Sequence, residues 1–187
     1  DCIQLRAKQM ADGELFAVAG QFVRICKDAG VLSIINDRAD IAVAAGADGI
    51  HLGQDDVPVA LVRKLLLGPL IIGKSTHSLA QLRAACDEPI TYASLGPVFA
   101  TPTKPAAEAV GIEYVRLAAQ ELEGKGIAGV AVGGIRPGNV EAVLSAGADA
   151  VAVCSAVITA SDPGAVCREL KRRISAFKDS QPESVAD

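Results

Sequence analysis

The chain has 187 residues and a formal net charge of −4; half of its residues are hydrophobic, only 3% are aromatic and none is Trp. This length suits a single buried core, and the acidic balance argues against a general nucleic-acid-binding protein. No apolar stretch approaches the roughly 20 residues that a membrane-spanning helix needs. A core of Ala, Val, Ile and Leu suits helices packed on a parallel sheet, whose strands are buried on both faces.

Apolar runs of strand length alternate with amphipathic segments along the chain. The strands are expected at residues 2–6, 31–36, 49–52, 70–74, 92–95, 129–132 and 150–153. The helices are expected at residues 12–29, 39–45, 58–67, 79–86, 113–123, 139–146 and 163–177, with one helical turn near residue 155. Asp12 is expected to cap the first helix. A single domain, 1–177, is expected to precede a disordered tail, 178–187, which is polar and aperiodic.

This alternation predicts a parallel sheet with right-handed crossovers. The turn Ala-Gly-Ala-Asp occurs twice, at 45–48 and 146–149, each time between a helix and a strand. No Gly-x-Gly-x-x-Gly opens a helix, which argues against a doubly wound dinucleotide-binding fold. Short, evenly spaced strands favour a (β/α)8 TIM barrel instead. Seven βα units are counted, so the expected fold is a TIM barrel lacking its first strand and helix, with the missing unit before Asp1.

Five cysteines are widely spaced along the chain and form no Cys-x-x-Cys pair. This spacing argues against a disulfide framework and against a structural zinc site. Most of the cysteines lie among apolar residues, where a cysteine usually acts as a small hydrophobic side chain. A reducing compartment, the cytoplasm, is therefore expected, and the sequence leaves a homo-oligomer open.

Polar residues gather where each predicted strand ends, although the strand bodies are almost purely apolar. In order, they are Gln4, Arg6 and Lys8; Asn36, Asp37 and Arg38; His51, Gln54, Asp55 and Asp56; Lys74, Ser75, Thr76 and His77; Thr101, Thr103 and Lys104; Gly133 and Gly134; and Ser155. The carboxyl ends of the strands form the active-site face of a TIM barrel. Stability alone does not explain this distribution, so a binding site is expected there.

The charges at this face suggest a pyrophosphate and a metal ion. The cations are Arg6, Lys8 and Lys104, and the acidic loops carry Asp37 and the pair Asp55-Asp56. Mg²⁺ usually takes one or two carboxylates together with substrate phosphates. The Gly133-Gly134 pair and the helical turn at Ser155 offer a second anion site through backbone N–H groups. The residues therefore predict two phosphate-bearing ligands in one site.

The chain resembles the thiamine-phosphate synthase (thiamine-phosphate pyrophosphorylase) family. The motifs that carry the resemblance are Gln4-Leu-Arg-Ala-Lys8, Ile35-Asn-Asp37, Gly49-Ile-His-Leu-Gly-Gln-Asp-Asp56, Gly73-Lys-Ser-Thr-His77, Gly96-Pro-Val-Phe-Ala-Thr-Pro-Thr-Lys104 and Gly133-Gly-Ile135. The resemblance implies a transferase that joins 4-amino-2-methyl-5-hydroxymethylpyrimidine diphosphate to hydroxyethylthiazole phosphate. Pyrophosphate would leave first, assisted by Mg²⁺, and the thiazole nitrogen would capture the pyrimidine methylene cation to give thiamine monophosphate.

The family motifs also imply a role for each matching residue. The pyrophosphate would be held by Arg6, Lys8, Asn36 and Lys104, and Mg²⁺ by Asp37 and Asp56. Gln4 would contact the aminopyrimidine, and Ser75 would lie near the reacting centre. The thiazole and pyrophosphate side would be lined by Thr101 and Thr103, and the thiazole phosphate would be bound by the backbone amides of Gly134, Cys154 and Ser155. Catalysis would be shared by Arg6, Lys8, Ser75 and Lys104. Cys154 departs mildly from the family pattern, and Asp55 leaves a one-residue ambiguity beside Asp56.

Several residues also have structural interpretations. Asp37 would cap the helix at 39–45, and Asp56 the helix that begins near Pro58. His51 is assigned a structural hydrogen-bonding role, while His77 either belongs to the site or orders its loop. Two other functions remain open: a thiazole tautomerase-like isomerase on the same scaffold, and an inactive barrel that binds a phosphate ligand.

Overall fold

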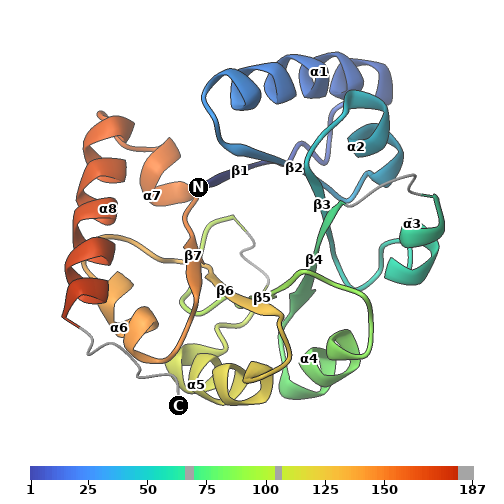
Figure 1. The fold of residues 1–187 in the computed structure, drawn as a ribbon. Helices are drawn as coiled ribbons and strands as arrows, with labels where there is room; N and C mark the ends of the chain where they lie inside the picture. Colours follow the sequence, from blue (N-terminus) through green and yellow to red (C-terminus); the bar gives the residue numbers. More distant parts are fainter. Residues whose placement is uncertain (66–69, 104–106, 181–187) are drawn as a thin grey trace. The chain divides into compact units, whose positions relative to one another are not determined.

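The computed structural model describes residues 1–65, 70–103 and 107–180. The strands in these ranges are β1 (Cys2–Leu5), β2 (Leu32–Asn36), β3 (Gly49–Leu52), β4 (Ile71–Thr76), β5 (Tyr92–Leu95), β6 (Ala128–Val132) and β7 (Ala150–Ala152). The helices are α1 (Asp12–Asp28), α2 (Ala39–Ala45), α3 (Val59–Leu65), α4 (Leu79–Cys86), α5 (Gly111–Leu122), α6 (Val140–Ser145), α7 (Ser155–Ile158) and α8 (Pro163–Asp179). Strands and helices alternate along the described chain (Figure 1), which confirms the predicted α/β class.

The chain divides into two compact units. Unit 1 comprises Asp1–Thr76 and Arg83–Ala93, and unit 2 comprises His77–Leu82 and Ser94–Asp187. Helix α4 and strand β5 each contribute residues to both units. None of the helices in the described ranges combines the length and the apolar character that crossing a bilayer requires.

Unit 1 is built on parallel strands that follow sequence order from β1 to β4. Its core is made of branched aliphatic side chains that are almost wholly buried, among them Ile34, Ile50 and Ile72. Helices α1 and α2 contact each other and β2, and Figure 1 shows them side by side. Gly46 ends α2 in the left-handed conformation, at φ 70°, a backbone geometry that glycine adopts without steric cost.

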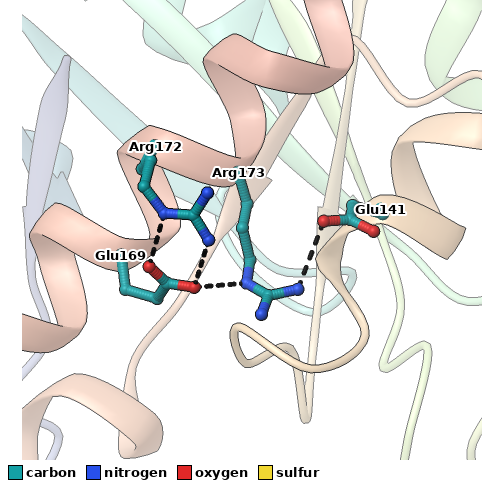
Figure 2. Close-up of polar contacts among 4 residues, drawn as sticks. All are labelled: Glu141, Glu169, Arg172 and Arg173. Atoms are coloured by element: carbon teal, nitrogen blue, oxygen red, sulfur yellow. Dashed lines mark hydrogen bonds and ion pairs between the residues drawn. The ribbon is translucent and has the colours of Figure 1, made fainter.

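Unit 2 contains the parallel pair β6 and β7 and the helices that follow them. Helix α5 packs on β6, α6 on β7, and α8 on both α6 and α7. An ion-pair network joins α8 to α6 through Arg173, which contacts Glu169 in its own helix and Glu141 in α6 (Figure 2). Arg172 pairs with Glu169 and completes the network.

Some predicted boundaries were wrong for identifiable reasons. Asp12 is the first residue of α1 rather than its cap, and its carboxylate pairs with Arg38, which lies far away in sequence. Strand β4 continues through Ser75 to Thr76, because both residues are buried within the sheet despite their polarity. Helix α8 runs on to Asp179, with Lys178 in its last turn, so the first two residues of the predicted tail are helical. Residues 181–187 lie outside the described ranges.

Candidate active site

Asp37 follows directly after β2 and has an unusual backbone conformation. Its φ of 65° lies in the left-handed region, which non-glycine residues seldom adopt and Asp tolerates better than most. The N–H of Asp37 donates to the carbonyl of His51 in β3 at 2.8 Å, and this bond holds the turn against the neighbouring strand. The cap position of α2 is Arg38, one residue after Asp37, and no side-chain cap bond is formed at that position. The Oδ2 of Asp37 lies 3.0 Å from Lys8 Nζ.

Asp56 and Asp37 form a pair of interacting carboxyl groups. Burial acts to raise the pKa of Asp37, but hydrogen bonds with Lys8 and Asp56 and the charges of Lys8 and Arg6 outweigh it, so the pKa lies below its ordinary value. Burial raises the pKa of Asp56; the Asp37 carboxyl adds to this, while the Gly53 N–H opposes it. The two carboxyl groups therefore interact directly, and each shifts the pKa of the other. Neighbouring carboxylates are the oxygen ligands that Mg²⁺ commonly takes from a protein.

The loop that carries Asp56 is tied to β4 by two side chains. Lys74 Nζ donates to the carbonyl of Gly53 at 2.9 Å, and Gln54 Nε2 donates to the carbonyl of Ser75 at 2.5 Å. Within the loop, the N–H of Gly53 donates to Asp56 Oδ2 at 2.6 Å, so Asp56 stabilises its own loop. Asp55 is exposed, whereas Asp56 is the neighbour that contacts Asp37. Lys74 and Gln54 were predicted at this face, but no role was predicted for either.

Three further residues of the predicted site, Asn36, Ser75 and Gln4, lie on one face of the unit 1 sheet. Asn36 pairs in register with His51, and His51 with Gly73. Paired residues of parallel strands point to the same face, as do alternate residues of one strand. Ser75 therefore shares this face, and Gln4 does so through its register with Ile34. Strand β1 ends at Leu5, so Arg6 and Lys8 lie beyond the strand, in the segment that reaches Asp37.

His51 forms hydrogen bonds through both ring nitrogens, as its predicted hydrogen-bonding role requires, although neither partner was predicted. Its Nε2 lies 2.8 Å from Ser75 Oγ, and its Nδ1 lies 2.9 Å from Tyr92 Oη. The His51 and Tyr92 rings stack with centroids 5.5 Å apart. Tyr92 begins β5 and also contacts Gln4 through a side-chain hydrogen bond. The sequence feature that could have identified Tyr92 as a partner is a large aromatic residue in the strand that follows the strand of Gly73.

Unit 2 holds the loop that follows β5. The N–H of Val98 donates to the carbonyl of Val132 at 2.8 Å, and Phe99 N–H to that of Gly133 at 3.1 Å. A Cβ on Gly133 would lie 2.4 Å from Pro97 Cβ, and one on Gly134 would lie 2.7 Å from Phe99 Cβ. The two glycines therefore leave room for the loop. His77 Nδ1 contacts the carbonyl of Gly96, which is the loop-ordering role considered for it.

The other predicted residues of unit 2 lie in two places. Thr101 Oγ1 accepts a bond from the N–H of Thr103 at 3.3 Å, within the loop. Cys154 and Ser155 lie at the junction of β7 and α7, where their carbonyls accept the first helical bonds. Lys104 lies outside the described residues.

Unit 1 therefore brings together Arg6, Lys8, Asp37 and Asp56 in one cluster and Gln4, His51 and Ser75 in another. In the described part of the chain, no three His, Cys, Asp or Glu side chains gather as one metal site. Two carboxylates are nevertheless a sufficient protein contribution for Mg²⁺ when phosphate oxygens and water complete its shell. The donor set of unit 1 fits that metal.

The chain was compared with known proteins. The profile of the family described as "Thiamine monophosphate synthase" matches residues 1–157. A relative named "Thiamine-phosphate synthase" from Thermosynechococcus vestitus is 42% identical over 178 residues, which are 95% of this chain and 50% of that protein. One of the same name from Acidothermus cellulolyticus is 41% identical over 177 residues, covering 94% of this chain and 82% of the relative.

The structural comparison agrees with the sequence comparison. The solved "Thiamine phosphate pyrophosphorylase from Pyrococcus furiosus" superposes with a TM-score of 0.86 at 31% identity, covering 94% of this chain and 83% of that one. The chain spans about half the length of some curated relatives, such as those from Thermosynechococcus vestitus and Gloeobacter violaceus. The family match extends over most of the chain, and the chain therefore belongs to the thiamine monophosphate synthase family.

Proposed function

We propose that this chain is a thiamine-phosphate synthase. It transfers the pyrimidine methylene group of 4-amino-2-methyl-5-hydroxymethylpyrimidine diphosphate to the nitrogen of hydroxyethylthiazole phosphate and releases pyrophosphate. Family membership supports this reaction, and so do relatives that bear the name thiamine-phosphate synthase. The observation that carries the proposal is the cluster in which Lys8 pairs with Asp37 at 3.0 Å and Asp37 contacts Asp56.

The proposed chemistry is dissociative. The carbon–oxygen bond to the diphosphate breaks first, and its electrons leave with the pyrophosphate. The thiazole nitrogen then forms the new bond to the pyrimidine methylene cation, giving thiamine monophosphate. Such a reaction needs stabilised negative charge and aligned partners rather than a protein nucleophile. The charged and polar side chains of unit 1 are suited to that work.

Arg6, Lys8 and Asn36 are proposed to bind the pyrophosphate, and Asp37 and Asp56 to hold Mg²⁺. Bound Mg²⁺ would supply further positive charge toward the pyrophosphate oxygens. Lys8 already lies beside Asp37, so this cation and the metal ligands occupy the same small region of unit 1.

The other roles follow the resemblance. Gln4 would bind the aminopyrimidine, and Ser75 would lie near the reacting centre. For unit 2, Thr101 and Thr103 are assigned to the thiazole and pyrophosphate side, Lys104 to the pyrophosphate, and the backbone amides of Gly134, Cys154 and Ser155 to the thiazole phosphate.

The same proposal includes a fold and a location. The fold is a TIM barrel formed as one domain, which the alternating strands and helices support. The location is the cytoplasm, which the five free cysteines support, because disulfides are rare in reducing compartments. The small-molecule substrates are the expected partners.

A direct assay tests the function. The purified chain is incubated with both substrates and Mg²⁺, and thiamine monophosphate and pyrophosphate are measured together, since the reaction forms them in equal amounts. Lys8→Met should remove most of the turnover, whereas Lys27→Met, an exposed lysine at the end of α1, should leave it unchanged. Isomerisation of the thiazole without the pyrimidine would point to a tautomerase-like enzyme. A folded chain that binds both substrates without product would refute the transferase.

A further inference from the structure

A continuous line of hydrogen-bonded side chains crosses three strands of unit 1. Tyr92 Oη lies 2.9 Å from His51 Nδ1, and His51 Nε2 lies 2.8 Å from Ser75 Oγ. His51 and Ser75 are buried, with exposed fractions of 7% and 5%. Both nitrogens of the imidazole are therefore engaged, one with a phenol and the other with the hydroxyl that the proposed function places near the reacting centre.

The backbone makes room for this line at Gly73. A Cβ at that position would lie 2.0 Å from Tyr92 Cζ and 2.4 Å from its Oη, distances that real Cβ atoms do not reach. Gly73 is the residue that pairs in register with His51. The absence of a side chain there allows the Tyr92 ring to lie over the strand, stacked on the imidazole. Two independent features, a glycine and a stacked ring, thus hold the phenol in reach of Nδ1.

The hydrogen bonds in this line have a preferred direction of donation. Burial, with a smaller contribution from Cys2, raises the pKa of Tyr92, although the bond with Gln4 opposes this rise. The phenol therefore keeps its proton and has one to donate. A neutral imidazole has one donor nitrogen and one acceptor nitrogen. If Tyr92 donates to Nδ1, the proton of His51 is on Nε2 and is donated to Ser75 Oγ, which leaves the Ser75 proton for another acceptor.

We propose that Tyr92 and His51 are positioning residues that hold Ser75 with its hydroxyl proton directed to the substrate. The inference rests on the proposed function for the identity of that substrate. Tyr92 fixes the tautomer of His51, and His51 fixes the orientation of Ser75. With His51 donating to its oxygen, the serine donates to an oxygen of the departing pyrophosphate, where negative charge develops.

The tautomer of His51 gives a test that needs no activity. The chain has two histidines, so the ¹⁵N imidazole signals of the labelled protein are assigned by comparison with a His77→Gln variant. At pH 8 an ordinary imidazole is neutral, and His51 should show a protonated Nε2 and an unprotonated Nδ1. Tyr92→Phe should give a mixture of both tautomers. A protonated Nδ1 in the wild-type chain, or an unchanged spectrum in Tyr92→Phe, overturns the proposal.

Kinetics then test the consequence for catalysis. Tyr92→Phe keeps the ring and should lower kcat about tenfold, equivalent to about 1.4 kcal/mol, with KM for the pyrimidine substrate changed less than about twofold. The matched control is Tyr114→Phe, which alters the other tyrosine and a 3.4 Å bond to the carbonyl of Ser78 in unit 2, and it should leave kcat unchanged.

Two substitutions of His51 separate positioning from packing. His51→Gln keeps an N–H donor that reaches Ser75 and should retain more kcat than His51→Asn, whose shorter side chain does not reach it. Equal kcat values for these two variants, or a normal kcat in Tyr92→Phe, would contradict the proposal. A wild-type chain without any synthase turnover would instead refute the proposed function, and the tautomer measurement would still decide the inference.

Discussion

The carboxylate of Asp48 accepts two hydrogen bonds from Ser33, one from the backbone N–H at 2.8 Å and one from the hydroxyl at 2.7 Å. The backbone bond has a counterpart in unit 2, where Asp149 Oδ2 accepts from the N–H of Gly129 at 2.7 Å. Both aspartates end an Ala-Gly-Ala-Asp turn. Each turn therefore connects a helix to a strand and also binds the start of the preceding strand, which explains why the motif recurs.

Asp48→Asn should weaken the fold of the chain at neutral pH but not in acid. Hydrogen bonds from the backbone and side chain of Ser33 lower the pKa of Asp48. A lowered folded-state pKa means that the ionised group stabilises the fold above the unfolded value of about 3.9, and that this stabilisation is lost as the pH falls through the folded-state pKa. Because Asp48 is solvent-exposed, we expect a loss of only about 1 kcal/mol at pH 7.

Urea unfolding at several pH values measures this effect. The difference between the wild-type chain and Asp48→Asn should shrink below about pH 4. Asp87→Asn, which changes an exposed aspartate in the same unit, is the control for the substitution itself. A stability gap that persists in acid would show that the charge of Asp48 is not the cause.

The elements of the fold could be predicted because strands and helices differ in their apolar periodicity. Asp37 and the Asp55-Asp56 pair could be predicted as neighbours because each follows a strand of the same parallel sheet, and the family motif singled out Asp56. The Tyr92–His51–Ser75 line could not be predicted in full, since it depends on a ring packing over Gly73 from a different strand. The pairing of Asp12 with Arg38 was missed for the same reason. An Asp before an amphipathic segment is typical of a helix cap, whereas its contact with Arg38 depends on the tertiary structure.

Gly133→Ala should destabilise the chain and disturb the loop after β5. Gly133 has a φ of 100°, and its Cβ would lie 2.4 Å from Pro97 Cβ. Backbone strain and displacement of the loop together should cost about 1–3 kcal/mol. Gly138→Ala is the matched control, because the nearest atom to its Cβ would be Arg136 Nε at 4.0 Å. We expect that control to change the free energy of unfolding by less than about 0.5 kcal/mol; equal losses in both variants would contradict the argument.

Arg173→Gln should lower the thermal midpoint slightly more than Arg172→Gln. Arg173 joins two helices, with Nε 2.6 Å from Glu169 and Nη1 3.2 Å from Glu141, whereas Arg172 pairs within α8 (Figure 2). Arg172 and Arg173 hold the pKa of Glu169 at about 2, so this carboxylate stays charged far into acid. The network is exposed, and we expect shifts of no more than about 2 °C. In 1 M salt, where the Debye length is about 3 Å, the two variants should melt together; a difference that survives high salt would indicate packing rather than charge.

Asp56→Asn should weaken binding of magnesium pyrophosphate, and Asp55→Asn should not. Asp56 contacts Asp37 and lies in a loop held to β4 by Lys74, while its neighbour Asp55 is exposed. Removing one of the two proposed carboxylate ligands should reduce Mg²⁺-dependent affinity about tenfold or more, because affinity for hard cations follows the charge of the ligand set. Calorimetric titration of each variant with pyrophosphate, with and without Mg²⁺, measures this without requiring turnover. Without Mg²⁺ both variants should bind pyrophosphate about as well as the wild type or better, since a carboxylate repels it. If Asp55→Asn is impaired and Asp56→Asn is normal, Asp55 rather than Asp56 is the metal ligand. If all affinities are equal, neither aspartate binds the metal, and the proposed Mg²⁺ site in this part of unit 1 is wrong.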